Sequence, residues 1–379
     1  MAIVFAFYAP LPASADSYNV NMYGNFDVSY DSISTGNSSN GKTGLTSNRV
    51  SSNTSFFGVK GSADAGKGLS AIWQVESLIA VGDSTINGTP TGATTNNGIG
   101  YLGNRNTFVG LNSDTYGTIL GGRNDTPYRL ATRRFDVFDR GIADNRSILG
   151  GSNVAAKVAF DGRQDQALEY ISPTLANITA AAAHINFNPT VNLGGQYQGN
   201  ATSVAAWYNT NGFYCSLAYE LHNLQNAANA SYSGSEHATK LGIAYMEQGV
   251  FTVSFAAEMT SDNLGTIGGN LYGHHAYYLS GKYYVGSTDA IKAALTSASN
   301  LGGGNTANTG ANQATIGYDH ILSKRTTLYA LYTKLNNQSA ANYSLSIYNG
   351  QAASIGGPTT IAGTGASPSS IAVGVQVTF

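Results

Sequence analysis

One stretch of this sequence is unusually rich in charged residues. Charged side chains make up only 11% of the 379 residues, yet the segment from Asn124 to Asp165 carries many of both signs. Its charged members are Asp125, Arg129, Arg133, Arg134, Asp136, Asp139, Arg140, Asp144, Arg146, Lys157, Asp161, Arg163 and Asp165. Opposite charges that face a narrow aqueous passage orient dipolar solutes and bias the passage of ions. The alternative is that they form salt bridges that only anchor a surface loop, each of which contributes little in water.

The elements that must position these charges are strands, because apolar and polar residues alternate near both ends of the chain. In the last ten residues, Ser370 to Phe379, every second side chain is apolar, and the intervening ones are small or polar. The same alternation holds from Tyr18 to Tyr30. Successive side chains of a strand point to opposite faces, so each segment has one apolar face and one polar face. The thirteen residues from Tyr18 to Tyr30 exceed a usual globular strand but suit a tilted strand that crosses a bilayer.

The alternation recurs with short and long breaks in turn, which predicts about 16 strands joined by roughly seven short turns and eight longer loops. An open sheet edge has no partner at bilayer depth, so the strands must close on themselves. The sequence therefore predicts an all-β fold, a transmembrane antiparallel β-barrel. The expected strands are Tyr18–Tyr30, Asn48–Ala63, Gly68–Ala80, Tyr101–Asn112, Thr118–Asn124, Gln166–Ser172, Ile178–Ile185, Thr202–Tyr208, Phe213–His222, His237–Met246, Val250–Ser261, Ala276–Tyr284, Ala290–Ser299, Ala311–Leu322, Thr326–Asn336 and Ser370–Phe379.

Composition and motifs argue against other classes of protein. The net charge of -2 gives no reason to expect a nucleic-acid partner, and the single cysteine, Cys215, excludes an intrachain disulfide. No Ser, His and acid grouping stands out, so we do not expect an enzyme. The adjacent His274 and His275 have no further ligand at a suitable spacing, and the glycines at 98, 100 and 103 do not follow a strand of a βαβ unit. We expect no metal and no cofactor.

The first fifteen residues resemble a secretory signal peptide. An apolar stretch leads to Ala13 and Ala15, which are spaced as a cleavage site before Asp16. The basic residues that usually begin such a signal are missing, so we expect the signal to be truncated at its N-terminus, and a short buried strand is the alternative. We assign residues 1–15 to the signal and residues 16–379 to the barrel.

Several motifs of the chain resemble the general-diffusion porins of Gram-negative bacteria, in particular the trimeric outer-membrane porins of the Neisseria and Burkholderia type. They span the chain from its first strand to its last residue, and are Met22 to Asp27, Phe57 to Glu76, Arg105 to Leu111, Tyr116 to Arg123 with Thr126 and Pro127, Glu169 to Pro173, and the terminal Phe379.

The resemblance implies a channel in the bacterial outer membrane through which ions and small hydrophilic solutes diffuse passively. It also implies a homotrimer surrounded by outer-membrane lipid and lipopolysaccharide. The alternatives are a solute-specific porin of the same architecture and a structural or adhesive outer-membrane barrel with a plugged lumen. In similar proteins a C-terminal aromatic residue is part of the signal read by the assembly machinery, a role that would fall to Phe379.

The resemblance further implies that the third long loop folds into the barrel and forms a constriction. The candidate residues of the loop are Asp125, Arg129, Arg133, Arg134, Asp136, Asp139, Arg140 and Asp144. Strand alternation supplies the opposing wall, since Lys60 faces inward if Phe57 and Val59 face lipid. The candidate residues of the wall are Asp27, Lys60, Glu76, Arg105 and Arg123, where Arg105 is expected inward if Phe108 faces lipid.

Two departures from the family pattern lie in this wall. Phe56 stands where the family usually has an arginine, and Glu169 stands where it often has a basic residue. Both changes remove positive charge from the expected wall, so weak charge selectivity is the expectation.

Overall fold

The computed structural model describes residues 18–79, 81, 102–151, 159–187, 197–226, 233–264, 270, 273–303, 307–345 and 364–379. The predicted signal segment, residues 1–15, lies outside this range, as does Lys157. In the part of the chain that is described, no helix is long and apolar enough to cross a membrane.

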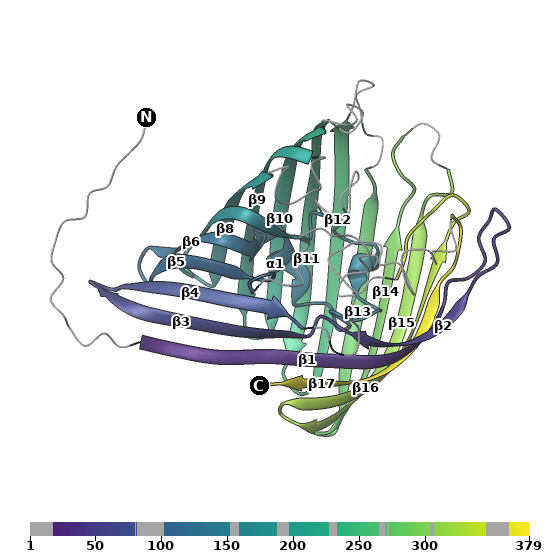
Figure 1. Ribbon diagram of the computed structural model, residues 1–379, viewed down its shortest axis with the longest axis horizontal. Helices are drawn as coiled ribbons and strands as arrows, with labels where there is room; N and C mark the ends of the chain where they lie inside the picture. Colours follow the sequence, from purple (N-terminus) through teal and green to yellow (C-terminus); the bar gives the residue numbers. More distant parts are fainter. Residues whose placement is uncertain are drawn as a thin grey trace.

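The described chain forms one antiparallel sheet that closes on itself (Figure 1). Apart from β2 and β3, which both pair with β1, consecutive strands are neighbours in the sheet, and seven of their connections are short turns. The strands are β1 (Tyr18–Ser34), β2 (Thr46–Ser52), β3 (Phe56–Gly66), β4 (Leu69–Leu78), β5 (Thr107–Ser113), β6 (Gly117–Asp125), β7 (Arg163–Ile171), β8 (Ile178–Phe187), β9 (Tyr197–Thr210), β10 (Phe213–Asn226), β11 (Gly234–Glu247), β12 (Phe251–Leu264), β13 (His275–Val285), β14 (Asp289–Ala298), β15 (Ala311–Ser323), β16 (Thr326–Asn337) and β17 (Ser369–Thr378). Two short helices, α1 (Pro127–Arg133) and η1 (Asn145–Ser147), lie between β6 and β7.

The seventeen strands form a barrel of sixteen, because β2 and β3 are two pieces of one barrel strand. Both pair with β1, β2 opposite its second half and β3 opposite its first. Between them, Asn53 donates its backbone N–H to the carbonyl of Asp27 at 2.8 Å, and Thr54 adopts a positive φ of 59°. The continuous strand predicted over Asn48–Ala63 is therefore interrupted, while the predicted 16-strand barrel is confirmed.

The first and last strands seal the barrel, as their alternation predicts. β1 pairs with β17 over ten residue pairs, from Asn25 opposite Thr378 to Ser34 opposite Ser369. The ring of Phe379 stacks on that of Phe26 with centroids 5.6 Å apart. A Cβ at Gly24 would lie 2.4 Å from the Phe379 ring, so glycine is needed there to admit the terminal aromatic.

The two faces of the sheet differ as a membrane barrel requires. Large apolar side chains such as Val109, Leu295 and Ile371 are more than half exposed on the outer face. The inner face carries small and polar residues, among them Ser203, Lys240, Glu258 and Thr333, each of which is 2% exposed or less. A barrel with an apolar exterior and a polar interior is the pattern of a water-filled pore.

Candidate functional site

The segment between β6 and β7 folds into the barrel rather than over its mouth (Figure 1). Its first turn is helix α1, capped by Thr126, whose hydroxyl accepts the backbone N–H of Arg129 at 3.3 Å, and Pro127 opens the helix. Inward-facing wall residues then hold the helix. Ser203 accepts the N–H of Tyr128 at 3.0 Å, and Glu258 accepts the Tyr128 hydroxyl at 2.7 Å. The predicted inward fold of the third loop is confirmed.

The start and the end of this loop are held together by an ion-paired group made of Asp125, Arg129 and Arg163. Both guanidinium groups lie 2.9 Å from the Asp125 carboxylate. Arg129 also donates to the carbonyl of Asp161 at 2.6 Å, which ties the start of the loop to its end. Because all three residues are largely buried and paired, Asp125 and Arg129 hold the loop rather than meet solutes.

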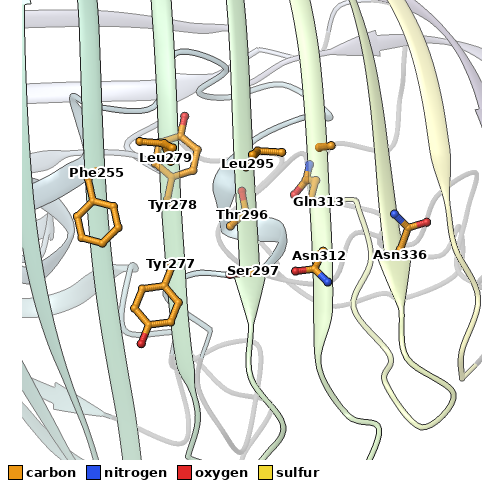
Figure 2. Close-up of a pocket in the computed structure, with 11 residues that line it drawn as sticks. Phe255, Tyr277, Tyr278, Leu279, Leu295, Thr296, Ser297, Asn312, Gln313 and Asn336 are labelled. Atoms are coloured by element: carbon orange, nitrogen blue, oxygen red, sulfur yellow. The ribbon is translucent and has the colours of Figure 1, made fainter.

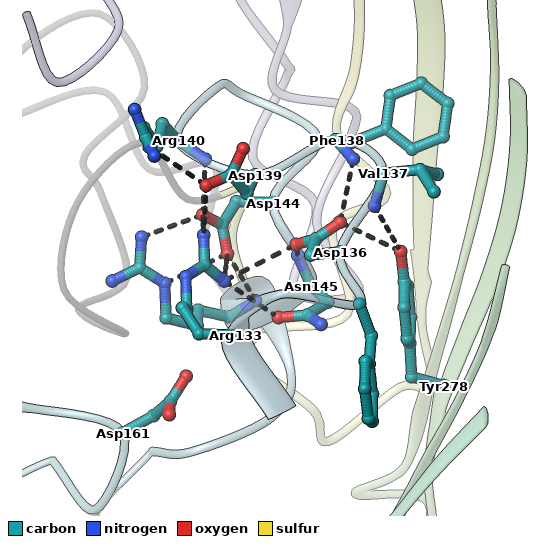
Figure 3. Close-up of polar contacts among 12 residues, drawn as sticks. Arg133, Asp136, Val137, Phe138, Asp139, Arg140, Asp144, Asn145, Asp161 and Tyr278 are labelled. Carbon is teal, nitrogen blue, oxygen red and sulfur yellow. Dashed lines mark hydrogen bonds and ion pairs between the residues drawn. The ribbon is translucent and has the colours of Figure 1, made fainter. Parts of the chain in front are cut away.

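Arg133 is the centre of the loop's charge cluster (Figure 3). Its guanidinium donates to both oxygens of Asp144, at 2.6 and 3.2 Å, and lies 3.5 Å from Asp136 and 3.7 Å from Asp139. Arg146 adds a second pair to Asp144, with hydrogen bonds of 2.7 and 3.0 Å. These charges lie close together and neutralise one another within the loop.

The two carboxyls beside Arg133 differ in their affinity for a proton. Burial raises the pKa of Asp136 to about 6, and the charge of Asp144 acts in the same direction. Burial also opposes ionisation of Asp144, but Arg133 and Arg146 outweigh it and hold the pKa of Asp144 well below its usual range. Of this pair, Asp144 is the carboxyl that stays ionised as the pH falls.

The turn of the loop from Asp136 to Arg140 is hydrogen-bonded to both sides of the lumen. On the side of β13, the Tyr278 hydroxyl donates to Asp136 at 2.8 Å and accepts the N–H of Val137 at 3.3 Å (Figure 3). On the opposite side, Thr54 donates its hydroxyl to the carbonyl of Arg140 at 3.2 Å. The break between β2 and β3 thus receives the turn at Arg140, and the loop reaches across the lumen.

Two arginines from other segments contact Phe56, the residue that stands where the resembled family usually has an arginine. The guanidinium carbon of Arg105 lies 4.4 Å from the centre of the Phe56 ring, and that of Arg140 lies 5.7 Å from it. Arg105 also forms an ion pair with Glu76, and Arg140 one with Asp139 at 2.9 Å. Two guanidinium groups therefore lie at this point of the wall, each paired with a carboxylate.

The register places three predicted wall residues on the lumen face. Lys60 pairs with Asn21 of β1 and with Gln74 of β4, and its ammonium lies 5.2 Å from the centre of the Tyr23 ring. Glu76 shares this face and accepts the Tyr23 hydroxyl at 3.1 Å. Asp27 accepts the hydroxyl of Tyr329 at 2.7 Å.

Two expectations about the wall need correction. Arg123 lies opposite Thr107 on the same outward side as Val109, where it pairs with Asp165 at 2.6 Å, so it does not share the lumen face predicted for it. Phe108 pairs with Gln74 and faces inward, not toward lipid. Arg105 nevertheless reaches the lumen, because it precedes β5, which begins at Thr107, and is not bound by the alternation of that strand.

Several charged residues of the far wall were missed by the sequence reasoning. Lys282 and Lys292 both bind Asp319, each at 2.8 Å. Lys240 lies between Asp161 and Glu258, at 3.2 and 3.6 Å. The alternation of β11, β13, β14 and β15 could have found the three lysines and Asp319, since each alternates in step with small or polar residues of its strand. In the described ranges, no group of three or more histidine, cysteine or carboxylate residues is placed to hold a metal ion.

Exposure separates the loop arginines into two kinds. Arg129, Arg133 and Arg146 are paired with acids. Arg134 is exposed, lies with its guanidinium carbon 4.5 Å from the centre of the Tyr214 ring, and forms no ion pair with any residue of the described ranges. Lys60 is likewise exposed and free of ion pairs among the described residues.

Comparisons with known proteins agree with this architecture. The family model described as "Gram-negative porin" matches residues 1–340. Major outer membrane protein P.IA of Neisseria meningitidis is 26% identical over 65% of this chain and 57% of its own length, and protein P.IB of Neisseria lactamica is 26% identical over 55% of this chain and 54% of its own length. The aligned part thus spans little more than half of these relatives.

Solved structures share the fold along the whole chain. An anion-selective porin from Comamonas acidovorans superposes with a TM-score of 0.73 at 22% identity, covering 96% of this chain and 100% of its own. A trimer form of OmpT from Vibrio cholerae superposes with a TM-score of 0.60 at 12% identity, covering 96% of this chain and 100% of its own.

Proposed function

The chain belongs to the Gram-negative porin family, and from this premise we propose that it is an outer-membrane channel for the passive diffusion of ions and small hydrophilic solutes. The observation that carries the proposal is a closed barrel with a polar interior, crossed by a loop that is bonded to both sides of the lumen. Such a lumen needs no energy source, because a solute crosses wherever a polar passage is wide enough.

The constriction of this channel lies between the third loop and the wall formed by β1, β3 and β4. Arg140, Asp139 and Arg134 contribute from the loop and Lys60 contributes from the wall, where Glu76 and Arg105 form a buried pair that shapes it. In this assignment Arg129, Arg133, Asp125, Asp136 and Asp144 set the shape of the loop, because their charges are largely used in buried pairs.

A weak preference for anions follows from the balance of charges open to water. The exposed residues without an ion pair in the described lumen include the cations Arg134 and Lys60, whereas Asp27 and Glu169 are buried and hydrogen-bonded. Two lysines also share one carboxylate at Asp319. The preference is weak because acids and bases alternate along the rest of the lumen.

A homotrimer with one pore per subunit is the assembly that we propose. It is supported by family membership and by the trimeric form reported for one protein of the same fold. Light scattering of the purified protein in detergent tests it directly, and a monomer would contradict it.

Planar-bilayer recording tests the channel itself. The purified protein should insert with stepwise increases in conductance, and a potassium chloride gradient should give a small reversal potential of the sign that anion preference requires. Absence of stepwise conductance from protein that migrates as a folded barrel would overturn the proposal.

Thiol labelling tests the constriction. The chain's one cysteine, Cys215, is first replaced by serine. In that background, Arg134→Cys should lose conductance on reaction with a bulky water-soluble thiol reagent. The matched control is Lys67→Cys, in the exposed turn between β3 and β4, where the same reaction should leave conductance unchanged. Equal responses at both positions would contradict the place given to Arg134.

A further inference from the structure

The wall formed by β13, β14 and β15 carries two lysines and an aspartate on its lumen face. Figure 2 shows these three strands side by side. Lys282, Lys292 and Asp319 point into the lumen, because successive side chains of a strand alternate between the faces and one residue next to each of them is exposed on the outer face, namely Tyr283, Ile291 and Tyr318.

The two lysines lie directly opposite each other on adjacent strands. Lys282 of β13 is the register partner of Lys292 of β14. Like charges placed opposite each other on neighbouring strands destabilise a sheet. Asp319 is the only carboxylate that pairs with either ammonium in the part of the chain that the structure describes. The three side chains together therefore carry a net positive charge.

Asp319 bridges the two lysines with its two carboxylate oxygens. Its Oδ2 lies 2.8 Å from the Lys282 ammonium, and its Oδ1 lies 2.8 Å from the Lys292 ammonium. An ammonium has three N–H donors, so each lysine can donate to a further oxygen while Asp319 is bound. The side chains of Lys282 and Lys292 are 21% and 11% exposed, against 5% for Asp319. The lysines are therefore the part of this group that a solute in the lumen can reach.

The group at Asp125, where two arginines share one carboxylate, differs from this one. Arg129 also donates to the carbonyl of Asp161, and Arg163 also donates to the side-chain oxygen of Asn106. Their side chains are 7% and 1% exposed. The second cation of that group is thus supplied with neutral acceptors and withdrawn from water, as a group that only holds the fold requires. The lysine pair is more open to water.

The lysine pair lies on the periplasmic side of the third loop. Lys282 is the fourth residue from the end of β13, Lys292 is the fourth residue of β14, and a short turn joins the two strands. Short turns of outer-membrane barrels face the periplasm. Toward the outside, the centre of the Phe138 ring in the loop lies 4.9 Å from the Lys292 ammonium. That ring packs on Gly317, the register partner of Lys292, where a Cβ would lie 2.7 Å from it.

We propose that Lys282 and Lys292 bind a small oxyanion, a carboxylate or a phosphate, between the third loop and the periplasmic end of the lumen. One oxygen of the anion meets each ammonium, as the two oxygens of Asp319 do, in charge-assisted hydrogen bonds. Chloride has a single acceptor atom, so the pair should favour oxyanions over it. The proposal rests on the channel proposed above and adds to it a site that solutes can saturate.

Block of the chloride current measures this binding. Single channels are recorded in dilute potassium chloride while sodium acetate or inorganic phosphate is added. Wild-type conductance should fall to half at a defined oxyanion concentration, whereas added chloride should raise it. The anion that blocks at the lower concentration identifies the class. A wild-type conductance that neither anion lowers would overturn the proposal.

Three variants test the residues. Lys282→Gln and Lys292→Gln should each raise the half-blocking concentration about ten-fold, because each removes a hydrogen bond to a charged group; this change corresponds to about 1.4 kcal/mol. Asp319→Asn should lower the half-blocking concentration, since the anion no longer shares the two ammonium groups with a carboxylate. If the three residues only held the strands together, none of these variants would shift the block.

The matched control is Lys324→Gln, which removes an exposed lysine from the short turn between β15 and β16, at the same end of the barrel. It should keep the wild-type half-blocking concentration. An equal change in Lys324→Gln, or an unchanged block in both Lys282→Gln and Lys292→Gln, would contradict the site. Stepwise conductance in potassium chloride alone should persist in every variant, so failure of this site is distinguishable from failure of the channel assignment.

Discussion

Replacing Arg133 by alanine should release the third loop without unfolding the barrel. The Arg133 side chain is 13% exposed and faces three carboxylates, those of Asp144, Asp136 and Asp139. Removing one partner of a buried ion pair costs roughly 3–5 kcal/mol, because the remaining charges stay desolvated. At about 1.4 kcal/mol per factor of ten, the population with a displaced loop should rise by about two to three and a half orders of magnitude.

Single-channel recording at high potassium chloride concentration reads out this displacement. Wild-type steps should be steady, whereas Arg133→Ala should give larger steps with rapid fluctuations, since the loop no longer holds one position in the lumen. The exposed neighbour Arg134 is the matched control, because Arg134→Ala removes the same charge from outside the buried pairs. It should keep a steady step.

Two results would refute this reasoning. Wild-type conductance and noise in Arg133→Ala would mean that the ion pairs do not hold the loop. Equal noise in Arg134→Ala would mean that loss of charge, and not loss of the buried pairs, disturbs the current. Retained β-sheet circular dichroism and retained migration as a folded barrel are needed in both variants, so that the comparison concerns the loop alone.

Three further predictions follow from the same contacts. Arg134→Ala should move the reversal potential in a salt gradient toward cation preference. Arg129→Ala should move it less, because Arg129 is paired with Asp125. A larger shift in Arg129→Ala than in Arg134→Ala would count against the assignment of the exposed arginine. Burial raises the pKa of Asp136 to about 6, so the loop loses a negative charge as the pH falls through that value. The anion preference of the wild type should therefore be greater at pH 5 than at pH 7.5. Asp136→Asn should have the greater anion preference at both pH values. Deleting Phe379 removes its stacking on Phe26 and should lower the amount of protein in the outer membrane, measured by quantitative blotting, more than it changes the conductance of the barrels that insert.

The architecture was predictable because a barrel strand repeats a two-residue pattern that needs no distant information. The alternation in β1 and β17 alone identified the two strands that close the barrel, and their register confirms it. The same rule placed Lys60 and Glu76 on the lumen face. It failed for Phe108, which faces inward, and for Arg123, which faces outward. It also could not foresee that β2 and β3 separate at Thr54 to meet the loop at Arg140.

The sequence by itself determined that this protein is a polar-lined barrel with a charged segment after its fifth barrel strand, since alternation and composition are local properties of the chain. Only the tertiary structure decided which of those charges remain open to water. Arg133 and Arg134 are adjacent in sequence and chemically identical, yet one is paired with three acids and the other is exposed beside Tyr214. The path of the loop through the lumen makes this difference, because ion pairing depends on distances between segments that are remote in the chain.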